Sequence, residues 1–240
     1  MNGGHPLPIV KKKSTHTVYF AGERFGFEHL LGNAYLAEAI FETSHGKYLC
    51  RLPQDAGLRS VHPRAVRDHD LRALLECDAG LFSFDASAPD SGPAGEFVLA
   101  KAADLPAVIL RGDLRGAADP WSRMAGLWPR TATVPLGSLH DYRALQRRLR
   151  PRGRRVRLDE VVRLAGQHAS ATAALLCDQV AAAVVRALDR VIAEDPVMPR
   201  HLREEIYHWL ALMPGLRGKA RDLRKEFEHH LERKVKKGLL

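Results

Sequence analysis

Two carboxylates six residues apart, Asp90 and Glu96 in DSGPAGE, give the first indication of chemistry in this sequence. Pro93 favours the first position of a helix, so a helix is predicted over PAGEFVLAKAA with its cap just before the proline. Glu96 then lies in the first turn, where the positive helix end favours an ionised carboxylate, a candidate nucleophile. The acids could instead serve only the helix dipole, but Gly95 would then weaken the helix without compensation. Close approach of a ligand to the backbone accounts for that glycine.

A third acid, Asp70, falls inside the apolar arc of a helix predicted over 62–78, an arc that includes Leu71 and Leu74, whereas Asp68 falls on the opposite side. In one interpretation Asp70 reaches solvent at the edge of the apolar arc or pairs with Arg67. In the other, it is a partly buried carboxylate directed at the edge of a sheet. Such a carboxylate would keep its proton to higher pH.

The elements that must position these acids alternate along the chain. Short β-rich runs at 16–22, 47–52, 79–84 and 107–110 are separated by helical patterns at 28–44, 62–78 and 93–104. This rhythm predicts an α/β fold, a flavodoxin-like or Rossmann-like parallel sheet flanked by helices, with a C-terminal helical extension. Sites in such sheets form at the carboxyl ends of the strands. The sequence contains neither GxGxxG after the first strand nor GxxxxGK[ST], which disfavours dinucleotide and P-loop sites.

Composition limits the class of protein. The hydrophobic share is 45%, no apolar run approaches the roughly 18 residues of a membrane span, and the N-terminus lacks a secretory signal. Three widely spaced cysteines favour a reduced, cytoplasmic setting. The net charge of +9 is concentrated at 143–163 and 217–240, so the remainder is nearly neutral. A small substrate is therefore favoured, nucleic acid is an unlikely partner, and no membrane is expected.

Four short motifs give the chain a resemblance to the nucleoside 2-deoxyribosyltransferases. They are VYFAG (18–22), PQD (53–55), HDL (69–71) and DSGPAGE (90–96), in this order. Each motif is weak by itself, but the ordered set is fairly specific. The resemblance covers about residues 16–140.

The resemblance implies a role for each matching residue. Glu96 would attack C1′ of a 2′-deoxyribonucleoside and hold the sugar as a glycosyl ester, and Tyr19 would orient its carboxylate. Asp70 would pass a proton to the leaving base, and Asp90 would bind the sugar. The resemblance also places a substrate-binding segment after the fourth strand, where PWSRM (120–124) has Ser122 in place of the family's Asn. The implied substrate-binding residues are Gly22, Gln54, Asp55, Ser91, Gly92, Ser122 and Met124. No cofactor or metal is implied.

The predicted organisation has three parts: an N-terminal arm (1–15), the α/β domain (16–150) and a helical region (151–240). We expect the helical region to mediate assembly of a homodimer or higher homo-oligomer, and the basic end from 218 to be dispensable for chemistry unless it closes that interface. The expected partners are a nucleoside and a free nucleobase. One alternative is a nucleoside or nucleotide N-glycosidase on the same fold. Another is a nucleotide-sensing or nucleic-acid-binding module.

Overall fold

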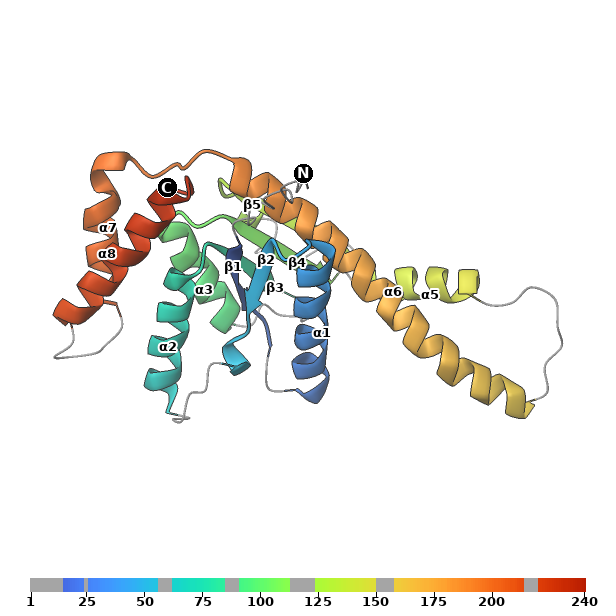
Figure 1. Cartoon of the computed structure of the whole chain (residues 1–240). Helices are drawn as coiled ribbons and strands as arrows, with labels where there is room; N and C mark the ends of the chain where they lie inside the picture. The colour runs from blue at the N-terminus through green and yellow to red at the C-terminus, as the bar shows by residue number, and fades with distance from the viewer. Residues whose placement is uncertain are drawn as a thin grey trace, which may run out of the picture.

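A fully parallel, five-stranded sheet lies between two layers of helices in the computed structural model, which describes residues 15–23, 26–55, 62–84, 91–112, 124–149, 158–213 and 220–240 (Figure 1). The strand order is β2-β1-β3-β4-β5, as in flavodoxin-like folds. The predicted α/β class is therefore confirmed. The strands are β1 (His16–Ala21), β2 (Tyr48–Arg51), β3 (Ala79–Ser83), β4 (Ala107–Gly112) and β5 (Thr131–Leu136).

Strand β5 was not among the predicted strands. Its sequence, TATVPL, is short and contains Pro135, which has no N–H to donate and normally argues against a strand. The strand pairs only with β4 at the edge of the sheet, where a proline is tolerated.

Side chains of β1 alternate between two cores. Val18 and Phe20 pack with helices α1 (Phe27–Thr43) and α6 (Leu158–Ala193). Tyr19 and Ala21 pack on the opposite face with α2 (Pro63–Glu76) and α3 (Ser91–Ala102). A 3₁₀ turn, η1 (Pro53–Asp55), lies between β2 and α2. The carboxyl edge of the sheet therefore has one helical layer on each side.

The C-terminal helices belong to these two cores. Leu188 and Val191 of α6 pack in the α1 layer, and Phe227 and Leu231 of α8 (Ala220–Lys236) pack in the cluster that contains Tyr19. The short helices η2 (Arg200–Leu202) and α7 (Arg203–Leu210) connect α6 to the α8 side. The expected boundary near residue 150 is therefore not a boundary in packing.

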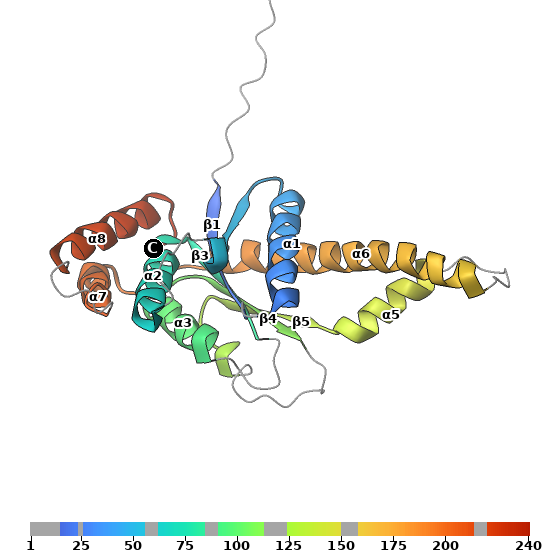
Figure 2. The same cartoon turned by 90° about the horizontal axis from the view of Figure 1, so that it is seen from below.

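Helix α6 is a long helix rich in alanine and valine. Its segment Ser170–Ala193 is long and apolar enough to cross a membrane by length and composition alone, although core helices pass the same test. Ala181, Val184 and Leu188 within it are buried against the sheet and α1. Together with α5 (Ser138–Leu149), the first part of α6 extends beyond the sheet (Figure 2).

Helix α8 closes the amino edge of the sheet. Arg233 donates to the carbonyl of Glu76 and Lys234 to that of Leu75, so both bind the carboxyl end of α2. Lys237 lies 2.6 Å from the fully buried carboxylate of Asp78. Burial alone would raise the pKa of Asp78, but hydrogen bonds from Lys237 and the Thr17 N–H and the charge of Arg233 lower it. The basic end is therefore built into the fold.

Candidate functional site

The strand order creates a switch point between β1 and β3. From β1 the chain passes through α1 to β2 on one side, and from β3 it passes through α3 to β4 on the other. Ligands of open parallel sheets bind in the crevice outside the carboxyl ends of the strands at such a point. Ala21 and Ser83 end these two strands. The residues that follow them, and the helices that flank them, form the candidate site.

Tyr19 lies within the sheet, two residues before the end of β1, and its side chain is fully buried. It packs in the core cluster that also contains Leu74 of α2 and Phe97 of α3. Tyr19 therefore lies on the face of the sheet covered by the two helices that carry Asp70 and Glu96.

Asp70 is only 5% exposed, as its place in the apolar arc of α2 predicts. Leu74, one turn later, packs in the core with Phe97 of α3, so Asp70 lies along the inner side of α2. The interpretation in which Asp70 reaches solvent is wrong. Asp68, expected on the opposite side, is also buried because Arg67 covers it, with Nε 2.8 Å from the carboxylate oxygen.

Helix α3 begins at Ser91, two residues earlier than predicted. Pro93 is its third residue, which is tolerated because the first N–H groups of a helix have no helical partner. Glu96 consequently lies in the second turn and is half-buried. The first-turn argument for its ionisation is therefore wrong, since the dipole effect fades beyond the first turn.

Phe97 fixes the position of Glu96. Its ring meets Phe82 of β3 edge to face, with centroids 5.3 Å apart, and Trp128 at 6.3 Å. These contacts hold the middle of α3 against the carboxyl end of β3.

The predicted substrate-binding residues have separate surroundings. Gly22 directly follows β1, and a Cβ atom there would meet Asn33 at 3.4 Å and Ser83 at 3.5 Å, so α1 and β3 approach closely. Gln54 donates to the carbonyl of Leu30 on α1 and does not join the acids of α2 and α3.

Further along, Gly92 is exposed in the first turn of α3, and Met124 is 60% exposed. Asp90 and Ser122 lie outside the described residues, as do the side chains of Asp55 and Ser91.

A cavity of about 550 Å³, here called the α2 cavity, opens between β2, α2 and α8. Tyr19 lines it together with His69, Ala73 and two ion pairs, Arg51–Glu76 and Arg72–Glu226, each with a 2.6 Å contact. Asp70 and Glu96 are not among its described lining residues.

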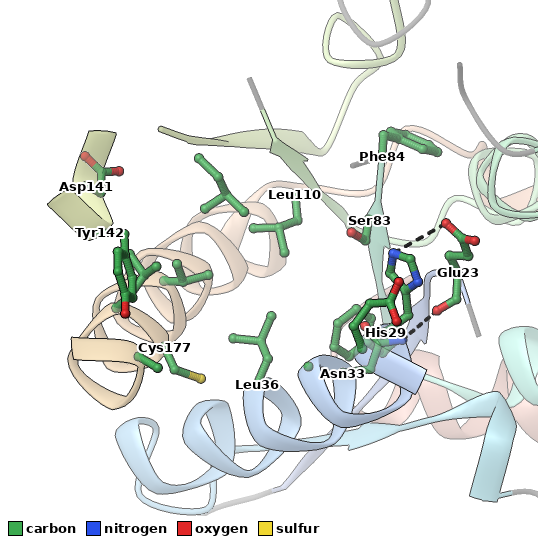
Figure 3. Close-up of a pocket in the computed structure, with 17 residues that line it drawn as sticks. Glu23, His29, Asn33, Leu36, Ser83, Phe84, Leu110, Asp141, Tyr142 and Cys177 are labelled. Atoms are coloured by element: carbon green, nitrogen blue, oxygen red, sulfur yellow. Dashed lines mark hydrogen bonds and ion pairs between the residues drawn. The ribbon is translucent and has the colours of Figure 1, made fainter. Parts of the chain in front are cut away.

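On the other face lies a second cavity of about 450 Å³, here called the α1/α6 cavity (Figure 3). Its apolar walls come from the sheet, α1 and α6: Phe20, Leu36, Leu110, Leu136, Leu176 and Val180. Glu23, His29, Asn33 and Ser83 lie at one end, and Asp141 and Tyr142 of α5 lie at the other (Figure 3).

Two contacts order the first end of the α1/α6 cavity. The Asn33 amide donates to the carbonyl of Glu23 at 3.0 Å, and His29 Nε2 lies 3.4 Å from the Glu23 carboxylate. Sequence reasoning missed this cavity because α5 and α6 contribute no motif. The available signal was the pair of polar residues, Glu23 and Ser83, at the ends of neighbouring strands.

No group of three His, Cys, Asp or Glu side chains within the described ranges could hold a metal ion.

Known proteins offer little likeness to the chain. No protein-family model matches it, and no curated protein matches it. Among solved structures, a conserved protein from Enterococcus faecalis is similar, with a TM-score of 0.40 and 27% sequence identity. The similar region covers 48% of this chain and 75% of that protein. A likeness at this TM-score carries no argument about the site or the activity.

Proposed function

We propose that the protein is an N-glycosyl transferase that exchanges the nucleobase of 2′-deoxyribonucleosides, with Glu96 and Asp70 as its catalytic residues. One observation supports the proposal: Asp70 is buried along the inner side of α2, in the helical layer that also contains α3, the helix that carries Glu96. Burying a carboxylate costs free energy unless the group is paired, and a catalytic role gives a reason to keep one there. The ordered motifs in the sequence agree with this assignment.

The reaction needs two groups with different roles. A carboxylate oxygen of Glu96 attacks C1′ as the bond from C1′ to the base nitrogen breaks, and Asp70 passes a proton to that nitrogen. The incoming base then attacks C1′, its proton passes to Asp70, and the Glu96 carboxylate is released. Two displacements at C1′ restore the β configuration.

The decisive experiment mixes a 2′-deoxyribonucleoside with a different free base and measures the exchanged nucleoside. Wild-type protein should form it, and Glu96→Gln should lower the rate by at least about 100-fold, the scale expected for loss of a catalytic group. Glu38→Gln, an exposed glutamate of α1, is the matched control and should keep wild-type rates. Near-normal exchange by Glu96→Gln would refute the assignment.

The same assay separates the alternatives. Release of deoxyribose and free base without exchange, at millimolar acceptor, would identify an N-glycosidase. A nucleic-acid-binding module would show neither reaction, but would shift a labelled oligonucleotide at physiological ionic strength.

We further propose that the protein works in the cytoplasm as a homo-oligomer. Cys50, Cys77 and Cys177 are free thiols, in keeping with a reducing compartment. Helix α1 presents an outward apolar stripe of Phe27, Leu31 and Tyr35, at 75%, 45% and 66% exposure. A stripe of this kind is typical of a surface that another subunit covers.

A further inference from the structure

We infer that the α1/α6 cavity is a second ligand site, separate from the proposed exchange chemistry, and that it binds a small aromatic amine. The cavity lies on the α1/α6 side of the sheet, whereas Tyr19 packs on the opposite side with the helices that carry Asp70 and Glu96. The inference does not rest on the proposed exchange reaction. It rests on the shape, lining and charge of the cavity.

The shape of the cavity fits a small molecule. Its volume of about 450 Å³ falls within the usual range of ligand pockets, roughly 300–1,000 Å³. It lies beside Ser83 and Phe84, where β3 ends, and beside Glu23, just after β1, so it opens at the switch point of the sheet.

The lining selects a flat, apolar body. Phe20 contributes an aromatic ring from the sheet side, and Tyr142 contributes a second from α5. Leu36 and Leu110 lie between the two polar ends (Figure 3). Aromatic faces attract both flat rings and cations.

The charge of the lining favours a ligand with a cationic group. Glu23, Glu28 and Asp141 contribute three carboxylates, and neither Lys nor Arg appears among the described lining residues, although the whole chain carries +9. His29 lies beside Glu23, with Nε2 3.4 Å from its carboxylate. An amine could bind Glu23 at the mouth while its ring enters between Phe20 and Leu110. A phosphate or carboxylate would meet repulsion there.

Isothermal titration calorimetry with four probes tests the inference: tryptamine, 3-methylindole, indole-3-acetate and adenine. Tryptamine should bind at least about tenfold more tightly than 3-methylindole, because its ammonium adds a charge-assisted hydrogen bond, and indole-3-acetate should bind most weakly. Equal or weaker binding of tryptamine relative to 3-methylindole would overturn the inference. Tighter binding of adenine would also overturn it, since the cavity would then belong to base exchange.

Variants locate the ligand. Val180→Trp should abolish binding by filling the cavity, and Gly32→Leu provides a second filling variant, because a Cβ atom at Gly32 would meet no atom within 4 Å. Glu23→Gln should weaken tryptamine about tenfold but change 3-methylindole by less than about twofold. Glu38→Gln is the matched control on α1. Unchanged tryptamine binding in both folded filling variants, or in Glu23→Gln, would refute the site.

Alkylation of the cysteines gives an independent location for the bound ligand. Cys177 lines the α1/α6 cavity, whereas Cys50 lines the α2 cavity. Saturating tryptamine should protect Cys177 from iodoacetamide and leave Cys50 unprotected, as measured by peptide mass spectrometry. Protection of Cys50 alone would place the ligand at the α2 cavity and contradict the inference. Calorimetry and alkylation require no turnover, so failure of the proposed exchange reaction would leave both results interpretable.

Discussion

Gly95 lies beside Glu96 in α3, and packing does not explain it. A Cβ atom there would meet no atom within 4 Å, and the residue lies inside a helix. Gly95→Ala should therefore raise the free energy of unfolding by about 0.5–1 kcal/mol, measured by urea denaturation, because alanine favours the helix. If a ligand approaches this backbone, the same variant should lower base exchange. A stabilised variant with full exchange activity would show that the glycine has no role in binding.

The environment of Lys234 leads to a prediction about how the free energy of unfolding depends on pH. Its side chain is fully buried, donates to the carbonyl of Leu75 and has its ammonium 5.5 Å from the centre of the Tyr207 ring. Burial, together with the charge of Arg233, lowers the pKa of Lys234 to about 7. In the unfolded chain a lysine keeps its proton to about pH 10.4.

Between these two pH values the unfolded state binds more protons, so the free energy of unfolding rises with pH. From pH 7 to 9 we expect the free energy of unfolding of the wild type to rise by on the order of 1–2 kcal/mol relative to that of Lys234→Met. Urea denaturation at both pH values measures this difference. Lys236→Met, at an exposed neighbouring position, is the control. Parallel pH dependences of wild type and Lys234→Met would contradict the prediction.

At the scale of elements, patterns within one segment were readable from sequence, and contacts between distant segments were not. The alternation of strands and helices predicts four of the five strands, and the apolar arc of α2 predicts the burial of Asp70. The start of α3 was misplaced because Pro93 can occupy more than one position in a first turn. The α1/α6 cavity depends on α5 and α6 meeting the sheet, which no local pattern encodes.

Asp104 joins elements that are far apart in the sequence. It ends the turn before β4 with φ of 53°, and one carboxylate oxygen accepts from the N–H groups of Val197 and Met198, both at 2.8 Å. The other lies 3.3 Å from the guanidinium of buried Arg130, which also donates to the carbonyl of Leu239.

Asp104→Asn keeps the shape and tolerates the positive φ, but leaves Arg130 without its counter-charge. We expect a loss of about 3 kcal/mol in the free energy of unfolding, in line with broken buried ion pairs. Asp195→Asn, at an exposed aspartate, should change stability by less than about 0.5 kcal/mol in the same urea titration.

At the scale of the whole molecule, α8 is part of the structure rather than an appendage. Leu223, Phe227 and Leu231 pack in the cluster that contains Tyr19. Deleting 220–240 should therefore expose this core and abolish cooperative thermal unfolding, measured by circular dichroism and calorimetry. A truncated chain with a wild-type melting transition would show that α8 is dispensable for stability.

The contacts of α8 and of the residues just after it also bear on when, during synthesis, the core can close. Lys237 donates to the carbonyl of Thr15, 222 positions earlier in the chain, and Arg130 reaches Leu239. A nascent chain emerges with β1 and α2 long before α8, so the face of the sheet that contains Tyr19 is not covered by α8 until the segments between them have been synthesised. Parallel strands already require long loop closures, which slow folding. The nascent protein is thus expected to be most prone to aggregation in the interval before α8 emerges and packs.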